Sequence, residues 1–351
     1  MTTTLWYTRC PAPTAASIAI RQGWLEEEFA ADGIAVRSIS EALDEPTRLA
    51  HYSHDHPALF RFGGYVPPLQ AMARGVDLRI IGLNWHDRVA GFFTLPDHPL
   101  AARRAEGTRA LAGARLALPI RKHDRTDWWR ATVLAGIAHL RAISAPGDAA
   151  PEIVPIEIER TYFDDATTGP EARASLWGSR SQFAVQREEV AALYRGEVDA
   201  IYSDAALAAI LTATTGAIPL VLFKGYEDDT EAGFGHPIVL TVSARLLKER
   251  SDLVDRWVAQ LLRAQGWVRA NRSETRRIFA NDTGLPEALL DHGYSARLPD
   301  QVDVSLSPER VALVRRKCKH LLKHGFLERD FDIEAMIDPG PLARLRNAKA
   351  A

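Results

Sequence analysis

Residues 5–39, LWYTRCPAPTAASIAIRQGWLEEEFAADGIAVRSI, decide the fold of this chain. They begin with a short, aromatic, β-prone run (5–9) and end with a second β-prone run (34–39). Between these runs, four large apolar side chains recur at helical spacing: Ile18, Trp24, Leu25 and Phe29. Pro13 suits the first turn of such a helix, and Gly33 suits its end. The stretch therefore predicts a βαβ unit whose two strands run parallel.

The same alternation continues along the chain and predicts an α/β fold throughout. We expect strands over 78–83, 89–95, 114–120, 152–158, 198–203, 218–223 and 236–243, and helices over 69–74, 127–144, 181–195 and 204–215. Prolines and glycines predict an irregular segment over 44–68. A helical return follows over 244–272, 274–281, 285–292 and 308–324. This order predicts two lobes, one formed by 1–97 and 236–351 and the other by 98–235, with a ligand cleft between them.

Composition favours a small-molecule partner. The 351 residues include 43 Lys and Arg and 45 Asp and Glu, so the net charge of −2 gives no basic field for nucleic acid or an anionic membrane. No apolar run approaches the length of a membrane span, and the N-terminus lacks the pattern of a secretory signal. We therefore expect a cytoplasmic protein, and a monomer.

Cys10 follows the first predicted strand and precedes the first predicted helix. Helix-terminal amides favour a negative group, so a cysteine there tends toward the thiolate that attacks electrophiles. The alternative is a small buried hydrophobic residue, which is the common role of a free cysteine. The other cysteine, Cys318, lies in an amphipathic basic helix and is expected to be structural. The two cysteines have no metal-ligand spacing, although a disulfide between them stays open.

Residues 51–64, HYSHDHPALFRFGG, hold the densest group of titratable side chains. His51, His54 and His56 invite a metal hypothesis, but the spacing is a weak signal and a proline follows the third histidine, so we expect no metal. Arg61, next to Gly63 and Gly64, can supply a planar cation and backbone N–H groups to an oxyanion. A tight turn with a surface arginine is the alternative. Motifs of nucleotide-binding loops, zinc proteases and serine hydrolases are absent from the sequence.

Aromatic side chains could line a pocket for an aromatic ligand, although such residues more often belong to the core. Tyr52 lies in the first lobe, and Trp129 and Tyr202 lie in the second. We expect these three to contact the substrate.

Four stretches together resemble the bacterial 2'-hydroxybiphenyl-2-sulfinate desulfinases: YTRCPAP (7–13), HYSHDHPALFRFGG (51–64), VPPL (66–69) and GEVDAIYSDA (196–205). The resemblance covers most of the chain. It implies the fold of type II periplasmic sulfonate- and nitrate-binding proteins, used as an enzyme without metal or organic cofactor. It further implies that Cys10 is essential and that His51, Arg61 and the backbone of Gly64 surround the sulfinate.

Three departures from that family concern the substrate. His56 replaces a neutral glutamine of the family's substrate loop, which predicts a changed substrate or pH range. We expect His54, His56 and Gly63 to contact the substrate there. Arg9 is expected to add a positive charge near the site. Residues 204–211 (DAALAAIL) replace a bulkier segment, which predicts a smaller or more open second-lobe wall, whereas WWRAT (128–132) partly matches the family.

The implied reaction is hydrolysis of an anionic aromatic sulfinate to an arene and sulfite. The Cys10 thiolate could attack sulfur, or the Cys10 thiol could protonate the ring carbon; the residues leave both routes open. His51 is expected to be the proton partner. The alternative function is a solute-binding protein for a sulfonate or other organic anion, without turnover.

Overall fold

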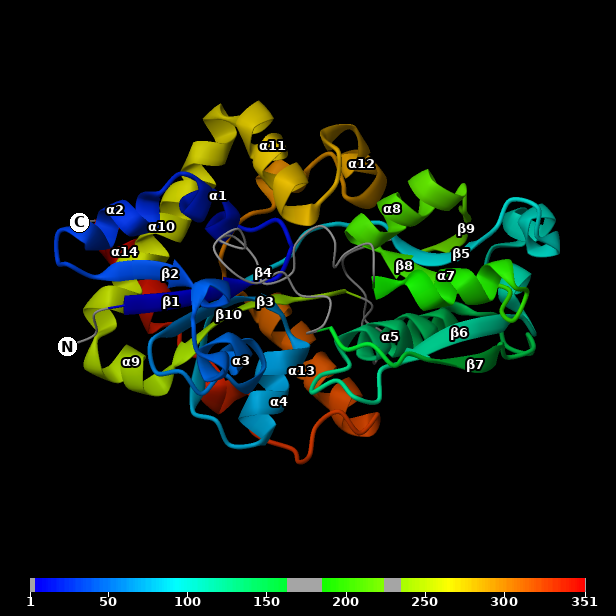
Figure 1. The fold of residues 1–351 in the computed structure, drawn as a ribbon, viewed down its shortest axis with the longest axis horizontal. Helices are drawn as coiled ribbons and strands as arrows, with labels where there is room; N and C mark the ends of the chain where they lie inside the picture. Colours follow the sequence, from blue (N-terminus) through cyan, green and yellow to red (C-terminus); the bar gives the residue numbers. More distant parts are fainter. Residues whose placement is uncertain (1–3, 163–184, 224–234, 351) are drawn as a thin grey trace.

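The structure is a computed structural model that describes residues 4–162, 185–223 and 235–350. Its strands form two groups side by side along the long axis, one drawn at the left of Figure 1 and one at the right. Both described ends of the chain lie at the left, so the chain leaves the first group and returns to it.

The first group is a five-stranded sheet in the order β2-β1-β3-β10-β4. Its strands are β1 (Thr4–Arg9), β2 (Ala35–Ser38), β3 (Leu59–Gly64), β4 (Leu78–Asn84) and β10 (Ile238–Ser243). β1 pairs in parallel with β2 and β3, whereas β10 is antiparallel to β3 and β4. The predicted βαβ unit is therefore confirmed.

The predicted first helix is divided in two. α1 (Ala15–Arg21) and α2 (Trp24–Ala30) are separated at Gly23, whose φ of 72° lies in the left-handed region that glycine adopts without strain. Thr14 caps α1 through the backbone N–H of Ser17. Pro13 thus precedes the cap, and its expected place in the first turn is wrong.

The expectation of an irregular segment over 44–68 is also wrong. This segment contains α3 (Glu45–Ser53), the central strand β3, and the start of α4 (Val66–Ala73). Asp44 caps α3, since its carboxylate accepts a hydrogen bond of 2.8 Å from the backbone N–H of Thr47. Prolines lie in the first turns of α3 and α4, where their missing N–H groups have no partner to lose.

In the second group, β5 (Ala90–Thr94) lies between β8 (Ile201–Asp204) and β9 (Ile218–Leu222), and β6 (Arg115–Ile120) pairs in parallel with β7 (Glu152–Glu157). A bridge between Leu116 and Ala200 joins the two sets. The helices are the 3-10 helix η2 (Pro99–Leu111), α5 (Trp128–Ile143), α7 (Arg187–Tyr194) and α8 (Ala205–Thr215).

The start of the helix expected over 181–195 lies outside the described residues. The lobe boundaries at 97/98 and 235/236 stay predictions. Because β5 pairs with β8 and β9, it belongs to the second group of strands, which favours passage of the chain from the first lobe to the second over 85–89.

The rest of the chain is mostly helical, as expected. Its α-helices are α9 (Ala244–Glu249), α10 (Ser251–Ala270), α11 (Arg272–Thr283), α12 (Leu290–Gly293), α13 (Pro308–Lys323) and α14 (Gly340–Ala350), and its 3-10 helices are η4 (Glu287–Leu289), η5 (Leu298–Asp300) and η6 (Glu334–Met336). None of the helices that the structure describes combines the length and apolarity needed to cross a bilayer.

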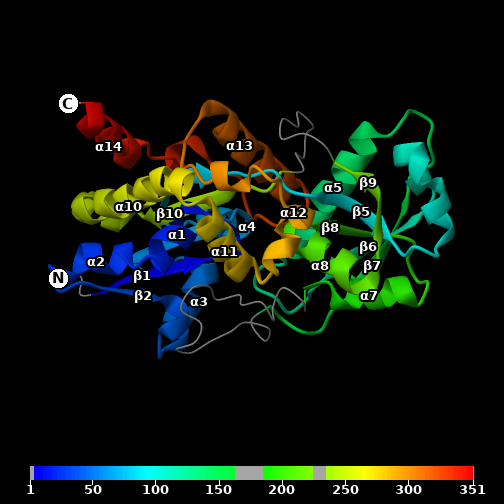
Figure 2. The same cartoon turned by 90° about the horizontal axis from the view of Figure 1, so that it is seen from above.

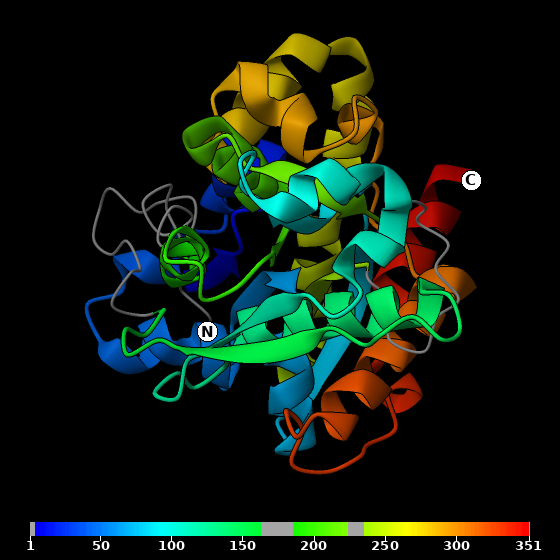
Figure 3. The same cartoon turned by 90° about the vertical axis from the view of Figure 1, so that its right-hand side faces the viewer.

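Two of these helices also contact helices that lie beside the second group of strands. α12 packs against α8 so closely that a Cβ atom on Gly293 would lie 2.5 Å from the carbonyl oxygen of Ala205. Leu321 of α13 shares a hydrophobic cluster with Ala131 of α5. Figure 2 shows α12 beside α8 and α13 beside α5. In Figure 3 the yellow and orange helices of the C-terminal part lie above the second group of strands, and the orange-red helices lie below it. The C-terminal helices thus hold both groups of strands around one central space.

Candidate active site

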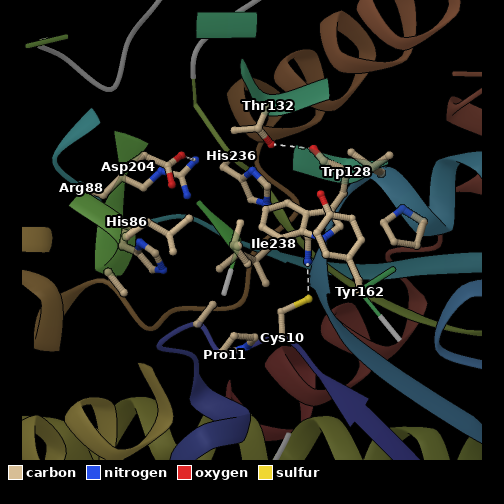
Figure 4. A pocket seen from close by; sticks show the side chains of 18 of the residues that line it. Cys10, Pro11, His86, Arg88, Trp128, Thr132, Tyr162, Asp204, His236 and Ile238 are labelled. Atoms are coloured by element: carbon tan, nitrogen blue, oxygen red, sulfur yellow. Dashed lines mark hydrogen bonds and ion pairs between the residues drawn. The ribbon is translucent and has the colours of Figure 1, made fainter. Parts of the chain in front are cut away.

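A cavity of about 120 Å³ lies between the two groups of strands (Figure 4). The first group contributes Cys10, His51, Tyr52, Arg61, Gly64 and Ile238; the second contributes Trp128, Thr132, Tyr162 and Asp204; and the connecting segments contribute His86, Arg88 and His236. The cavity therefore joins the two expected lobes. It contains the predicted Cys10, His51, Arg61, Gly64 and Tyr52.

The Cys10 thiol is surrounded by donors from β3. The backbone N–H of Gly64 lies 3.3 Å from Cys10 Sγ, and Arg61 Nη2 lies 3.8 Å from it. Arg61 is 1% exposed and is held by a 2.8 Å hydrogen bond from Nη1 to the carbonyl oxygen of Gly64. Burial lowers the pKa of Arg61, opposed by Cys10 and Tyr52, yet a guanidinium stays cationic at physiological pH. The site therefore supplies a buried cation and an N–H group beside the sulfur.

Both glycines of the RFGG stretch are needed for close packing. A Cβ atom at Gly63 would lie 2.5 Å from Cys10 Sγ, although Gly63 itself does not line the cavity. A Cβ atom at Gly64 would lie 2.7 Å from His236 Nε2. The missing side chains thus allow the thiol and the His236 imidazole to approach β3.

His51 is buried at the end of α3, with Nδ1 hydrogen bonded to Thr8 Oγ1 of β1 at 2.9 Å. Burial lowers the pKa of His51 well below its ordinary value, and the positive charge of Arg61 lowers it further. The imidazole is therefore neutral at physiological pH. Tyr52 is also buried, and burial raises its pKa, so its hydroxyl stays protonated.

The structure places His54 and His56 outside the cavity lining. His54 ends α3 with a left-handed φ of 59°, and its buried Nδ1 donates to the carbonyl oxygen of Tyr52 at 3.1 Å. His56 is half-buried beside Trp6, and its Nδ1 accepts a hydrogen bond from the N–H of Ala58. Within the described ranges, no three His, Cys, Asp or Glu side chains gather closely enough to hold a metal ion.

Trp129 and Tyr202 lie in the core instead of the cavity lining. Trp129 Nε1 donates to Glu189 Oε1 at 2.7 Å, and the Tyr202 hydroxyl donates to Asp204 Oδ2 at 3.2 Å. Trp128 lines the cavity in place of Trp129, because adjacent residues of a helix face directions about 100° apart. The structure therefore places the helix of the expected tryptophan at the cavity, but with Trp128 and not Trp129 in the lining.

Arg9 does not add a free charge to the site. Its guanidinium forms two hydrogen bonds, of 2.8 and 2.7 Å, with the Asp282 carboxylate of α11. Both side chains are buried, and the pair lies away from the cavity lining. Cys318 is a second free cysteine, buried in α13, where burial raises the pKa of its thiol to about 12.

Sequence reasoning missed a polar wall formed by His86, Arg88, Asp204 and His236. An ion pair of 3.0 Å joins Arg88 Nη2 to Asp204 Oδ2. These residues lie at the crossing between the strand groups and at the ends of β8 and β10. The clue was positional, because ligand sites in α/β folds occur where strands end and the chain crosses over.

The chain is similar to proteins of known activity. It is 27% identical over 350 residues to the 2'-hydroxybiphenyl-2-sulfinate desulfinase of Rhodococcus erythropolis, an alignment that covers 96% of this chain and 92% of the relative. No protein-family model matches it. Its structure is similar to that of a cysteine-to-serine variant of DszB in complex with biphenyl-2-sulfinic acid, with a TM-score of 0.75 and 25% identity over 99% of this chain and 100% of the other.

The fold is shared more widely. The periplasmic aliphatic sulphonate binding protein SsuA of Escherichia coli matches with a TM-score of 0.61 and 15% identity over 96% of this chain and 92% of that one. The predicted α/β fold of the periplasmic-binding-protein type is confirmed, as is the resemblance to the desulfinases.

Proposed function

We propose that this protein is an enzyme that hydrolyses the carbon–sulfur bond of an aromatic sulfinate and releases sulfite. The observation that carries the proposal is the Cys10 thiol, facing a cavity with the Arg61 guanidinium and the Gly64 N–H beside it. Similarity to a sulfinate desulfinase over almost the whole chain supports it.

Each group at this wall has a proposed role. Arg61 and the Gly64 N–H bind the sulfinate oxygens, because a cation and a backbone donor together stabilise an oxyanion. The neutral His51 exchanges a proton during turnover, oriented by its hydrogen bond to Thr8. Trp128 and Tyr162 contact the aromatic part of the substrate.

Two balanced routes are compatible with this arrangement. In the first, the Cys10 thiolate attacks sulfur, the carbon–sulfur bond breaks, the aryl carbon takes a proton, and water releases hydrogen sulfite from the cysteine. In the second, the Cys10 thiol protonates the aryl carbon, sulfur dioxide leaves, and water converts it to hydrogen sulfite and a proton. An acid quench during turnover separates the routes, because only the first adds sulfur dioxide to Cys10.

The test is sulfite release from 2'-hydroxybiphenyl-2-sulfinate and from two smaller aryl sulfinates. Cys10→Ser should abolish release and keep ligand affinity within about tenfold, since serine retains the size but not the reactivity of the thiol. Cys318→Ser is the matched control, because this cysteine lies in α13 outside the cavity lining, and it should keep the wild-type rate.

Sulfite release that persists in Cys10→Ser would remove Cys10 from the mechanism. If the wild type releases no sulfite but sulfonates or sulfinates raise its melting temperature, the protein binds such anions without turnover. Cytoplasmic residence and a monomeric state remain proposals from the sequence.

A further inference from the structure

The cavity has a second polar wall, which the proposed chemistry at Cys10 does not use. Figure 4 shows His86, Arg88 and Asp204 together on one side of the cavity and Trp128 and Tyr162 on the other. An aromatic substrate between these sides would meet aromatic rings at one end and hydrogen-bonding groups at the other.

His86 is the unusual member of this wall. It is 6% exposed and lines the cavity, and neither Nδ1 nor Nε2 has a hydrogen-bond partner on another residue. A buried polar group without a partner destabilises the fold, so ring nitrogens that face a cavity unpaired point to a ligand. The Tyr294 ring packs edge-on against the imidazole at 5.3 Å and restricts its position.

The backbone around His86 is fixed on both sides. The N–H of Asp87 donates to Gln301 Oε1 at 3.0 Å, and the N–H of Val89 donates to the carbonyl oxygen of Gly293 at 2.9 Å. Asn84 donates through Nδ2 to the carbonyl oxygens of Gln301 and Asp303. His86 is therefore preorganised, and a ligand would not have to order it.

The chemistry of this wall favours an uncharged group that both donates and accepts hydrogen bonds. Burial lowers the pKa of His86 to about 3, so its ring is neutral and offers one N–H donor and one bare nitrogen acceptor. Arg88 is already paired with Asp204, which in turn accepts a hydrogen bond from Tyr202. A hydroxyl group matches the imidazole, whereas a second anion would compete with Asp204 for Arg88.

We propose that His86 is a specificity-determining residue that binds a hydroxyl substituent on the aromatic substrate, in addition to the sulfinate bound near Cys10. This inference rests on the proposed desulfinase function and deepens it, since it names the side chain that distinguishes a hydroxylated aryl sulfinate from one without the hydroxyl group. A substrate without the hydroxyl leaves His86 unpaired, and rejection of such analogues is strong where a buried polar group loses its partner.

The experiment compares 2'-hydroxybiphenyl-2-sulfinate with biphenyl-2-sulfinate. The wild type should prefer the hydroxylated compound by about tenfold or more in kcat/KM. His86→Phe retains a planar ring but has no nitrogen, and its preference should fall to within about threefold. His123→Phe is the matched control, because this exposed histidine pairs with Glu159 outside the cavity lining, and the wild-type preference should persist in it.

The same two compounds are then bound to Cys10→Ser, with and without His86→Phe, and affinity is measured by calorimetry. Turnover of both compounds by the wild type at equal kcat/KM would overturn the role of His86 and leave the desulfinase function standing. Absence of turnover, with tighter binding of the hydroxylated compound that His86→Phe removes, would reject the desulfinase function and support the hydroxyl site. A preference that survives in His86→Phe would overturn the inference.

Discussion

Cys10 derives its surroundings from β3 more than from the helix that follows it. The N-terminus of α1 begins after Thr14 and is satisfied by a capping box between Thr14 and Ser17. The groups beside the sulfur are instead Gly64 N–H and Arg61, which β3 places there through its parallel pairing with β1. A rigid strand fixes these donors before substrate arrives, which is what stabilisation of a developing charge requires.

His51 predicts how activity depends on pH. Burial and Arg61 hold its pKa below 6.5, so the neutral form needed to accept a proton persists on mild acidification. We expect the acidic limb of the kcat/KM profile to lie below about pH 6.5, the ordinary histidine value. His51→Gln should lose this limb, and its kcat should fall by about 10²- to 10⁴-fold. Sulfite release measured across this range tests both expectations.

Thr8→Val is the control, since it removes the hydrogen bond to His51 Nδ1 but keeps the imidazole. Its profile should keep the limb. An acidic limb that stays unchanged in His51→Gln would show that another group carries the proton.

The site residues predicted from the sequence come from two kinds of signal. Cys10, Arg61 and Gly64 lie in two short stretches whose chemistry the local pattern indicates, whereas the role of His51 is implied by the resemblance to the desulfinases. The parallel pairing of β1 with β3 brings these stretches together. His86 and His236 lie in separate connections far apart in sequence, and only the folded chain brings them into one cavity. A single sequence contains no local signal for such a wall.

At the level of elements, the Arg9–Asp282 pair joins β1 to α11 across the core. Its two hydrogen bonds are bidentate, and the Asp282 side chain is 0% exposed. Asp282→Asn leaves a buried cation with a neutral partner, so the free energy of unfolding should fall by roughly 3–5 kcal/mol. Urea denaturation followed by tryptophan fluorescence measures this change.

Glu274→Gln is the matched control in the same helix, because it breaks the exposed pair with Arg277. It should leave the free energy of unfolding nearly unchanged. The double variant Arg9→Met, Asp282→Leu should be more stable than Asp282→Asn, since no unpaired charge stays buried. An Asp282→Asn protein as stable as the wild type would contradict this account of the pair.

The elements that the sequence predicted well are the ones with regular apolar patterns. β4 and α5 fall within a residue or two of their expected ranges. The segment around α3 and β3 differs from its expected irregular structure because prolines occur in helix first turns as well as in breaks: Pro46, after the capping residue Asp44, lies in the first turn of α3. Hydropathy alone also does not tell which of Trp128 and Trp129 faces a cavity, because both are apolar.

At the scale of the whole molecule, buried histidines couple folding to pH. Burial lowers the pKa of six of the described histidines: His51, His54, His56, His86, His236 and His320. Above about pH 6.5 both folded and unfolded chains keep them neutral. Below it, the unfolded chain takes up protons that the folded chain does not, so each histidine lowers the free energy of unfolding by up to about 1.4 kcal/mol per pH unit.

Glu189 acts in the opposite direction. Burial raises its pKa from 4.5 to about 7, although the hydrogen bond from Trp129 Nε1 opposes the shift. Between these values the folded chain holds a proton that the unfolded chain has lost, so acidification stabilises the fold through this group. Burial also raises the pKa of Glu26, Asp127 and Asp204, which act in the same direction as Glu189. Each carboxyl group offsets about one histidine, and six histidines outnumber these four, so the net free energy of unfolding should fall as the pH drops from about 6.5 to 5.

Glu189→Gln separates the two effects. Glutamine keeps an oxygen to accept from Trp129 but does not titrate, so the variant should lose stability more steeply below pH 7, by about 1.4 kcal/mol per pH unit. It should also be more stable than the wild type at about pH 8, where Glu189 is ionised and buried. Urea denaturation of both proteins across this range measures the slopes. Parallel slopes would mean that Glu189 has an ordinary pKa in the folded chain. A wild-type curve that is flat below pH 6.5 would mean that the folded chain takes up protons at its buried histidines as readily as the unfolded chain does.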